Sequence, residues 1–138
     1  MPKLAVIVTR GAFNNLLQVA TLVRTAGGAG HAVRVLFRDE AVLKLTRHRI
    51  NAVDLSPAYG GLEPEVIARL QAADFVDLAS YLRECKEHGD DVRLFACTSS
   101  MYVAGVREED LVDAIDAPKS LADFLQEDLA DATHVLTF

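Results

Sequence analysis

The sequence lacks tryptophan, holds only two cysteines and is poor in aromatic residues, which make up 7% of its 138 positions. Two cysteines are too few for a disulfide scaffold. No apolar run approaches the roughly 20 residues that a membrane-spanning helix needs. The opening apolar run 3–9 is too short for the core of a signal peptide and ends at Arg10. We therefore expect a cytoplasmic protein with no membrane contact.

The composition is that of an ordinary globular protein. Hydrophobic residues make up 51% of the chain and charged residues 25%, which rules out an intrinsically disordered chain. A chain of this length buries enough surface for a complete core without metal or disulfide staples. No linker-like or repetitive stretch divides it, so we predict a single domain over residues 1–138.

The net charge of −6 argues against nucleic-acid binding, which needs a basic face to displace counterions. The charge is uneven along the chain. Residues 1–50 hold eight Lys or Arg against two acids, and residues 51–138 hold six against eighteen. The basic first part is compatible with a local anion site, with self-association through opposite charge, or with a merely solvated surface.

Apolar strand-like runs alternate with helical patterns, which predicts a parallel sheet with helices on both faces. The predicted strands are 3–9, 32–37, 92–97 and 134–138. The predicted helices are 14–26, 39–45, one that begins at Glu63, one that restarts at the capping-box-like spacing of Asp74 and Asp77, 107–115, and 121–129 after the Ser120–Asp123 capping spacing.

Ligands of parallel α/β proteins bind at the carboxyl ends of the strands. The residues at those ends are Arg10, Arg38 and Cys97. Backbone N–H groups at the start of a following helix stabilise a thiolate, and the hydroxyls that follow Cys97 can also donate to it. The alternative is that Cys97 is a small hydrophobe at the sheet edge. Cys85 lies on the apolar face of a helix, too far from Cys97 for a disulfide, and we expect it to be structural.

Several other patterns point away from cofactors and metals. The stretch Gly27–Gly30 follows a helix and precedes a strand, which is typical of a helix C-terminus and opposite to a phosphate-binding loop. No nucleophile-elbow motif is present. The four histidines have no ligand spacing. We therefore predict neither a metal nor a cofactor. These histidines are His31, His48, His88 and His134.

The stretch Arg47–Leu62 is the least regular part of the chain. A loop of this length in a small domain is usually functional or an oligomer contact. We predict that its larger apolar and aromatic side chains lie in a subunit interface. These are Ile50, Val53, Leu55 and Tyr59.

Residues 96–105 read Ala-Cys-Thr-Ser-Ser-Met-Tyr-Val-Ala-Gly. A strand that ends in Ala-Cys, followed by two residues, Ser-Met, three residues and Gly, resembles the DsrE/DsrF-like family of sulfur-relay proteins. The acidic segment 108–111, the helix around 122–125, the final apolar strand and the segment 37–41 (Phe-Arg-Asp-Glu-Ala) extend the similarity. The single-chain branch often labelled peroxiredoxin-like is the most similar. No Thr-x-x-Cys motif precedes the thiol, so peroxidase chemistry is not supported.

The resemblance implies a three-layer α/β/α fold with a sheet of about five strands, a homotrimer or homohexamer, and a cysteine that carries sulfane sulfur. By position that cysteine is Cys97. Candidate substrate-binding residues are Ser99, Ser100 and Met101 of the motif and Arg10 and Arg38 of the rim. The expected partners are rhodanese-like donors and small sulfur-carrier proteins. Tyr102 stands where relatives often have an acid, which leaves the donor and partner open.

The sequence therefore predicts a sulfurtransferase or sulfur carrier with a Cys97 persulfide. The alternative is a non-enzymatic oligomeric α/β module that binds a small anion or nucleotide-like ligand, with Cys97 in a structural role.

Overall fold

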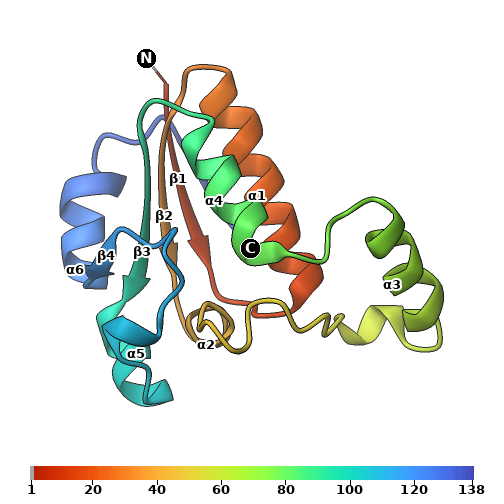
Figure 1. Cartoon of the computed structure of the whole chain (residues 1–138). Helices are drawn as coiled ribbons and strands as arrows, with labels where there is room; N and C mark the ends of the chain where they lie inside the picture. The colour runs from red at the N-terminus through yellow and green to blue at the C-terminus, as the bar shows by residue number, and fades with distance from the viewer. Residues whose placement is uncertain (1) are drawn as a thin grey trace.

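In a computed structural model, which describes residues 2–138, five parallel strands form one sheet in the order β4-β3-β2-β1-β5. This confirms the expected α/β fold with a sheet of about five strands. Since every pair of neighbouring strands is parallel, all five strands end at the same edge of the sheet, as the arrows of β1 and β3 show (Figure 1). The strands are β1 (Lys3–Val8), β2 (Ala32–Phe37), β3 (Val92–Cys97), β4 (Ala117–Lys119) and β5 (His134–Thr137).

Helices cover both faces of the sheet and the edge where the strands end (Figure 1). α1 (Phe13–Gly28) and α4 (Leu78–Glu87) pack side by side on one face. α6 (Leu121–Phe124), extended by the π-helical turn η3 (Leu125–Leu129), lies on the other face. The remaining helices are α2 (Glu40–Lys44) and α5 (Thr98–Ala104) at the carboxyl edge, α3 (Glu63–Ala72), and the short 3₁₀ turns η1 (Pro57–Tyr59) and η2 (Glu108–Asp110).

The alternation of side chains along each strand builds two cores of unequal size. The larger core fills the space between the sheet, α1 and α4. The smaller core lies beneath α6 and contains Ala5, Leu36, Cys97 and Phe124, all of them fully buried. Burial on both faces explains why residues 4–8 of β1 are a continuous apolar run in the sequence.

The predicted C-terminus of the first helix is confirmed. α1 ends at Gly28, and Gly30 adopts a positive φ of 85° that favours glycine. Gly27 and Gly89 also approach each other closely. A Cβ atom on Gly89 would lie 2.7 Å from the Cα of Gly27. These glycines therefore serve a turn and a close backbone contact, as the order helix–glycine–strand predicts.

The prediction of an acidic helix over residues 107–115 is wrong. Only the three-residue turn η2 forms. Leu111 is extended and pairs with Thr46 in an isolated antiparallel bridge, and a turn follows at residues 113–114. Val112 and Ala114 are buried in the larger core. The strand β4 follows and was not predicted, because three residues that include Pro118 carry no periodic signal.

The restart predicted at Asp74 is a break between two separate helices. Asp77 is the N-cap of α4, and its side chain accepts the backbone N–H of Ser80 at 3.1 Å. Asp74 lies outside both helices with a φ of 61°. The capping unit is therefore Asp77 with Ser80 and not the pair of Asp74 and Asp77.

The prediction that the apolar side chains of the loop 47–62 all lie in a subunit interface is wrong. Ile50 is 1% exposed and belongs to the larger core, and Val53 packs against that core. The loop is tied down by polar contacts as well. The backbone N–H of Phe13 donates to the carbonyl of Asp54, and Ser56 N–H donates to the side chain of Asn14. The loop is long because it closes one end of the core over the start of α1.

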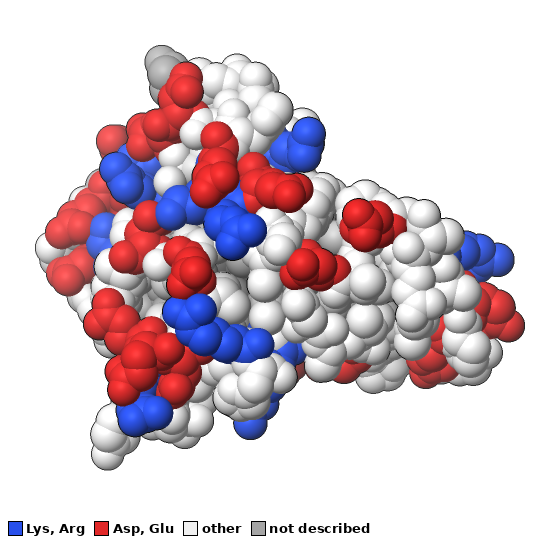
Figure 2. Space-filling view, viewed as in Figure 1, with Lys and Arg blue, Asp and Glu red and all other residues white. Residues whose placement is uncertain are grey.

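Basic and acidic side chains alternate over the face shown in Figure 2, and no extended patch of one sign forms on it. Folding therefore brings the basic side chains of residues 1–50 and the acidic side chains of residues 51–138 together on this surface. Within residues 2–138, none of the helices combines the length and apolar character that a membrane crossing requires.

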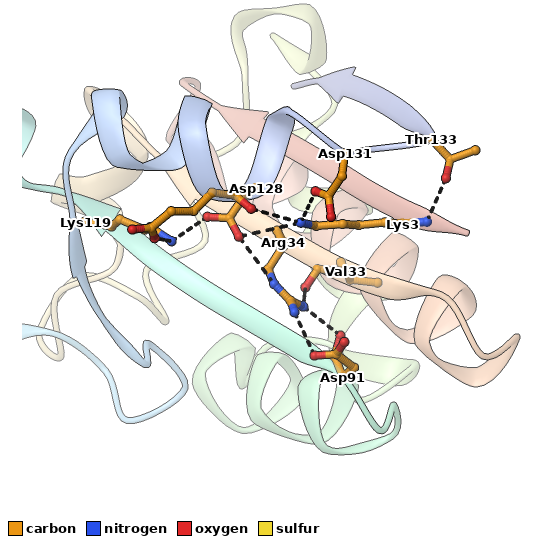
Figure 3. Close-up of polar contacts among 9 residues, drawn as sticks. Lys3, Val33, Arg34, Asp91, Lys119, Asp128, Asp131 and Thr133 are labelled. Atoms are coloured by element: carbon orange, nitrogen blue, oxygen red, sulfur yellow. Dashed lines mark hydrogen bonds and ion pairs between the residues drawn. The ribbon is translucent and has the colours of Figure 1, made fainter. Parts of the chain in front are cut away.

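A buried carboxylate fastens the π-helical turn to the sheet (Figure 3). The side chain of Asp128 is 6% exposed, and its Oδ2 lies 2.6 Å from Nζ of Lys119. Its Oδ1 lies 3.5 Å from Nε of Arg34 and 4.0 Å from Nζ of Lys3. These three cations belong to β4, β2 and β1, so one carboxylate connects η3 to three strands. Asp131, which is exposed, also pairs with Lys3 at 2.6 Å.

Candidate functional site

Cys97 ends β3 and directly precedes α5, as predicted. The residue is fully buried and belongs to the smaller core with Leu36 and Phe124. Its Sγ lies 3.3 Å from Oγ of Ser99. A thiol in this position has an apolar core on one side and a hydroxyl on the other, so its polar contacts decide its ionisation.

The Cys97 thiol is activated in spite of its burial. Burial alone raises the pKa, since it disfavours the charged form. The Ser99 hydroxyl, the backbone N–H and hydroxyl of Ser100 and the Arg38 side chain act in the opposite direction, because each donates to the thiolate. Their combined effect lowers the pKa of Cys97 to about 7. The thiol is therefore more readily ionised at neutral pH than a free cysteine, and the thiolate is the nucleophilic form.

Ser100 links the Cys97 thiol to the turn that follows β2. Its Oγ accepts the backbone N–H of Asp39 at 2.9 Å, which leaves the hydroxyl proton free to donate to Cys97. Asp39 has φ 53° and ψ −129°, a conformation that costs a non-glycine residue on the order of 1–3 kcal/mol. This contact helps to hold the strained turn, which directly follows Arg38 in the chain.

A surface hollow of about 410 Å³ opens next to this cluster. Arg38, Ser99 and Ser100 line it and also donate to Cys97, so they form the wall between the hollow and the thiol. The other lining residues are Thr9, Asp39, Val103 and Ala104. Val103 is 84% exposed, and Tyr102, its neighbour in the chain, is 89% exposed. The arrangement therefore places an ionisable thiol behind polar side chains, beneath an opening bordered by exposed apolar groups.

The structure brings together four of the six predicted site residues: Cys97, Ser99, Ser100 and Arg38. Arg10 lines a separate hollow of about 580 Å³, with Glu40 and Lys44 among its neighbours.

Met101 is 8% exposed and belongs to the larger core, so it supports α5 from below. Four of the lining residues were not predicted from the sequence: Thr9, Asp39, Val103 and Ala104. Thr9 directly follows β1, and Val103 and Ala104 are one helical turn after Ser99 and Ser100, so strand ends and helical spacing contained the signal. Asp39 gave no such signal, because its place depends on the strained turn.

Cys85 differs from Cys97 in its surroundings. It is buried in the larger core, and burial raises the pKa of its thiol. Both cysteines are free. In the described chain, residues 2–138, no three His, Cys, Asp or Glu side chains gather in a group that could hold a metal ion. The reactive thiol therefore stands without a resolving cysteine beside it.

The pH dependence of Cys97 alkylation tests the activation of the thiol. We expect the rate with iodoacetamide in a Cys85→Ser background to rise with pH and to reach half its maximum near pH 7. Replacement of Ser99 by alanine removes a donor to the thiolate and is expected to move this midpoint to higher pH. The rate at pH 7 is expected to fall about fivefold, the equivalent of roughly 1 kcal/mol.

The matched control is Thr98→Ala, which removes an exposed neighbouring hydroxyl and is expected to leave the profile unchanged. A midpoint in the parent protein at the value of an unfolded peptide, about 8.5, would contradict the activation of Cys97.

The fold and the site define a parallel α/β protein with an activated cysteine at the carboxyl edge of its sheet. The family model of the DsrE/DsrF-like family matches residues 3–138, and the chain belongs to this family. Membership points to a role in sulfur relay. Among solved structures, a protein of unknown function from Methanobacterium thermoautotrophicum is similar, with a TM-score of 0.67 and 13% identity over 99% of each chain. That likeness supports the fold. No curated protein matches the chain.

Proposed function

We propose that this protein is a sulfurtransferase or sulfur carrier that holds sulfane sulfur on Cys97. The observation that carries the proposal is the cluster of Ser99, Ser100 and Arg38, which donates to a thiol with a pKa of about 7 beside an open hollow. Family membership supports the same chemistry.

In the loading step, the Cys97 thiolate attacks the outer sulfur of a donor persulfide, R–S–S–H. A bond forms between Sγ and this sulfur, the S–S bond of the donor breaks, and its electron pair leaves with R–S⁻. The product is Cys97–S–S–H, and no external oxidant or reductant is needed. In the unloading step an acceptor thiolate attacks the same outer sulfur, and the electron pair returns to Sγ of Cys97.

Because Cys97 is fully buried, loading requires a side chain of the wall to move. Arg38 and Ser99 lie between the thiol and the hollow, and side-chain rotation is faster than any rearrangement of the sheet. The exposed apolar side chain of Val103 lines the same opening, and its neighbour in the chain, Tyr102, is also exposed. This exposed surface supports the proposal that the partners are proteins with thiols of their own, such as rhodanese-like donors or small sulfur carriers.

The test is the intact mass of the protein after incubation with inorganic polysulfide and removal of the excess. We expect the mass to increase by whole sulfur atoms and to return to its original value after treatment with dithiothreitol. An unchanged mass at all polysulfide concentrations would contradict the proposed function and would favour a binding module with a structural cysteine.

We also predict self-association into a trimer or hexamer. Leu62, before the outlying helix α3, is 54% exposed, and the edge strand β5 exposes Val135 and Leu136. An unpaired edge with apolar side chains favours contact with another chain. Light scattering at micromolar protein and moderate salt is expected to give several times the chain mass of 15.0 kDa. A monomer over that concentration range would contradict this prediction and leave the Cys97 chemistry untouched.

A further inference from the structure

One polar side-chain atom stands apart in the part of the chain that the structure describes. The Nε atom of Arg38 is shielded from solvent and has no hydrogen-bond partner, and it is the only buried side-chain nitrogen or oxygen of residues 2–138 in this position. A buried donor without an acceptor costs on the order of 1–3 kcal/mol. Such a group is rare in folded proteins, and an acceptor that a ligand or a modified neighbouring residue supplies would explain it.

The surroundings of Arg38 contain no carboxylate that satisfies it. Among residues 2–138 no acidic side chain forms an ion pair with Arg38, although Asp39 and Glu40 follow it in the chain. The guanidinium lies instead beside the Cys97 thiol and lines the hollow. Its charge is therefore available to an anion at the position of Cys97.

We propose that the Nε–H of Arg38 is the donor that holds the outer sulfur of the Cys97 persulfide. This inference rests on the proposed function and adds the residue that retains the cargo. A disulfide-type S–S bond is about 2 Å long, so a sulfur added from the hollow lies that far beyond Sγ, on the side where the Arg38 side chain lines the hollow. A persulfide is more acidic than the parent thiol, and its anion gives the unpaired Nε–H an acceptor of opposite charge.

The chemistry of retention follows from this contact. With polysulfide as donor, the Cys97 thiolate and the polysulfide dianion give Cys97–S–S⁻ and a polysulfide dianion shorter by one sulfur, so atoms and charge balance. The persulfide anion is electron-rich and resists attack by a second thiolate, whereas the protonated persulfide is open to it. By stabilising the persulfide anion, Arg38 slows the transfer of the sulfur to thiols that do not displace the Arg38 guanidinium.

The experiment compares Arg38→Gln, Arg38→Lys and a matched control, Arg83→Gln, which changes an exposed arginine on α4. Each protein is loaded with polysulfide, desalted and challenged with dithiothreitol, and the surviving persulfide is followed by intact mass. In Arg38→Gln we expect the half-life of the persulfide to fall at least about tenfold. The pH midpoint for alkylation of the loaded sulfur is expected to rise. Arg83→Gln is expected to match the parent protein in both.

The outcomes separate three cases. If Arg38→Lys loses sulfur as fast as Arg38→Gln, the guanidinium N–H and not the charge alone retains it, as proposed. If Arg38→Lys matches the parent, or if both Arg38 variants do, the assignment of Nε–H is overturned while the proposed function stands. If the parent itself never loads, the proposed function fails. Thermal unfolding of each variant shows that it is folded, and the pH midpoint is a readout that a purely structural role of Arg38 does not move.

Discussion

Replacement of Cys97 by serine is expected to abolish sulfur loading, with persulfide formation reduced at least about a hundredfold. The hydroxyl that replaces the thiol is not ionised at neutral pH and forms no persulfide. Intact mass after incubation with polysulfide measures the effect. The fold is expected to survive, because serine is close in size to cysteine.

The matched variant is Cys85→Ser, which removes the other cysteine of the chain. Burial raises the pKa of the Cys85 thiol, and Cys85 is packed in the larger core. We therefore expect Cys85→Ser to load as much sulfur as the parent. If Cys97→Ser still loads sulfur and Cys85→Ser does not, the cysteine that carries sulfur is Cys85 and not Cys97. The cluster of Ser99, Ser100 and Arg38 would then have a role other than the activation of a sulfur-carrying thiol.

Replacement of Asp128 by asparagine is expected to have the largest effect on stability. The carboxylate is 6% exposed and faces Lys3, Arg34 and Lys119 from three strands (Figure 3). Removing one partner of a buried ion pair leaves charge without compensation and costs about 3 kcal/mol. For a chain of this size that corresponds to a decrease of about 10 °C in the unfolding midpoint. Thermal and denaturant unfolding both measure it.

The control for this variant is Asp131→Asn in the same cluster. Asp131 pairs with Lys3 at 2.6 Å, but its side chain is exposed, so water screens the pair. We expect its unfolding midpoint to stay close to that of the parent. Equal effects of the two variants would show that the burial of Asp128 contributes nothing and that the cluster acts as an ordinary surface network.

Asp128 also bears on the site, because α6 and η3 cover the small core that contains Cys97. Lys119 stands next to Cys97 in the register of β3 and β4. Burial lowers the pKa of Lys119, but its bonds to Asp128 and Glu127 outweigh this, and its pKa is raised. The ammonium is therefore charged at neutral pH and keeps the cover of the small core attached to the sheet.

The strands β1, β2 and β3 were predicted within a residue or two, since each is a short, mainly apolar segment of the sequence that is largely buried in the sheet. The segment 107–115 was predicted wrongly, because its acidic composition favours a helix, while burial of Val112 and Ala114 in the larger core and the bridge from Leu111 to Thr46 depend on remote parts of the chain. The strand β4 depends on pairing with β3, a contact that no local pattern records. Ile50 likewise looked available for an interface and is covered by elements remote in the chain.

By itself the sequence determined the parallel α/β fold and the position of Cys97 at the carboxyl end of a strand, next to hydroxyl-bearing residues. Both follow from local periodicity and from the rule that parallel strands end at one edge. Only the tertiary structure decided that Arg38 and not Arg10 lies beside the thiol, since Arg10 lines a separate hollow. It also decided that Met101 supports the site from the core. Ionisation depends on which groups surround a buried atom, and those groups come from strands that are neighbours in space and distant in sequence.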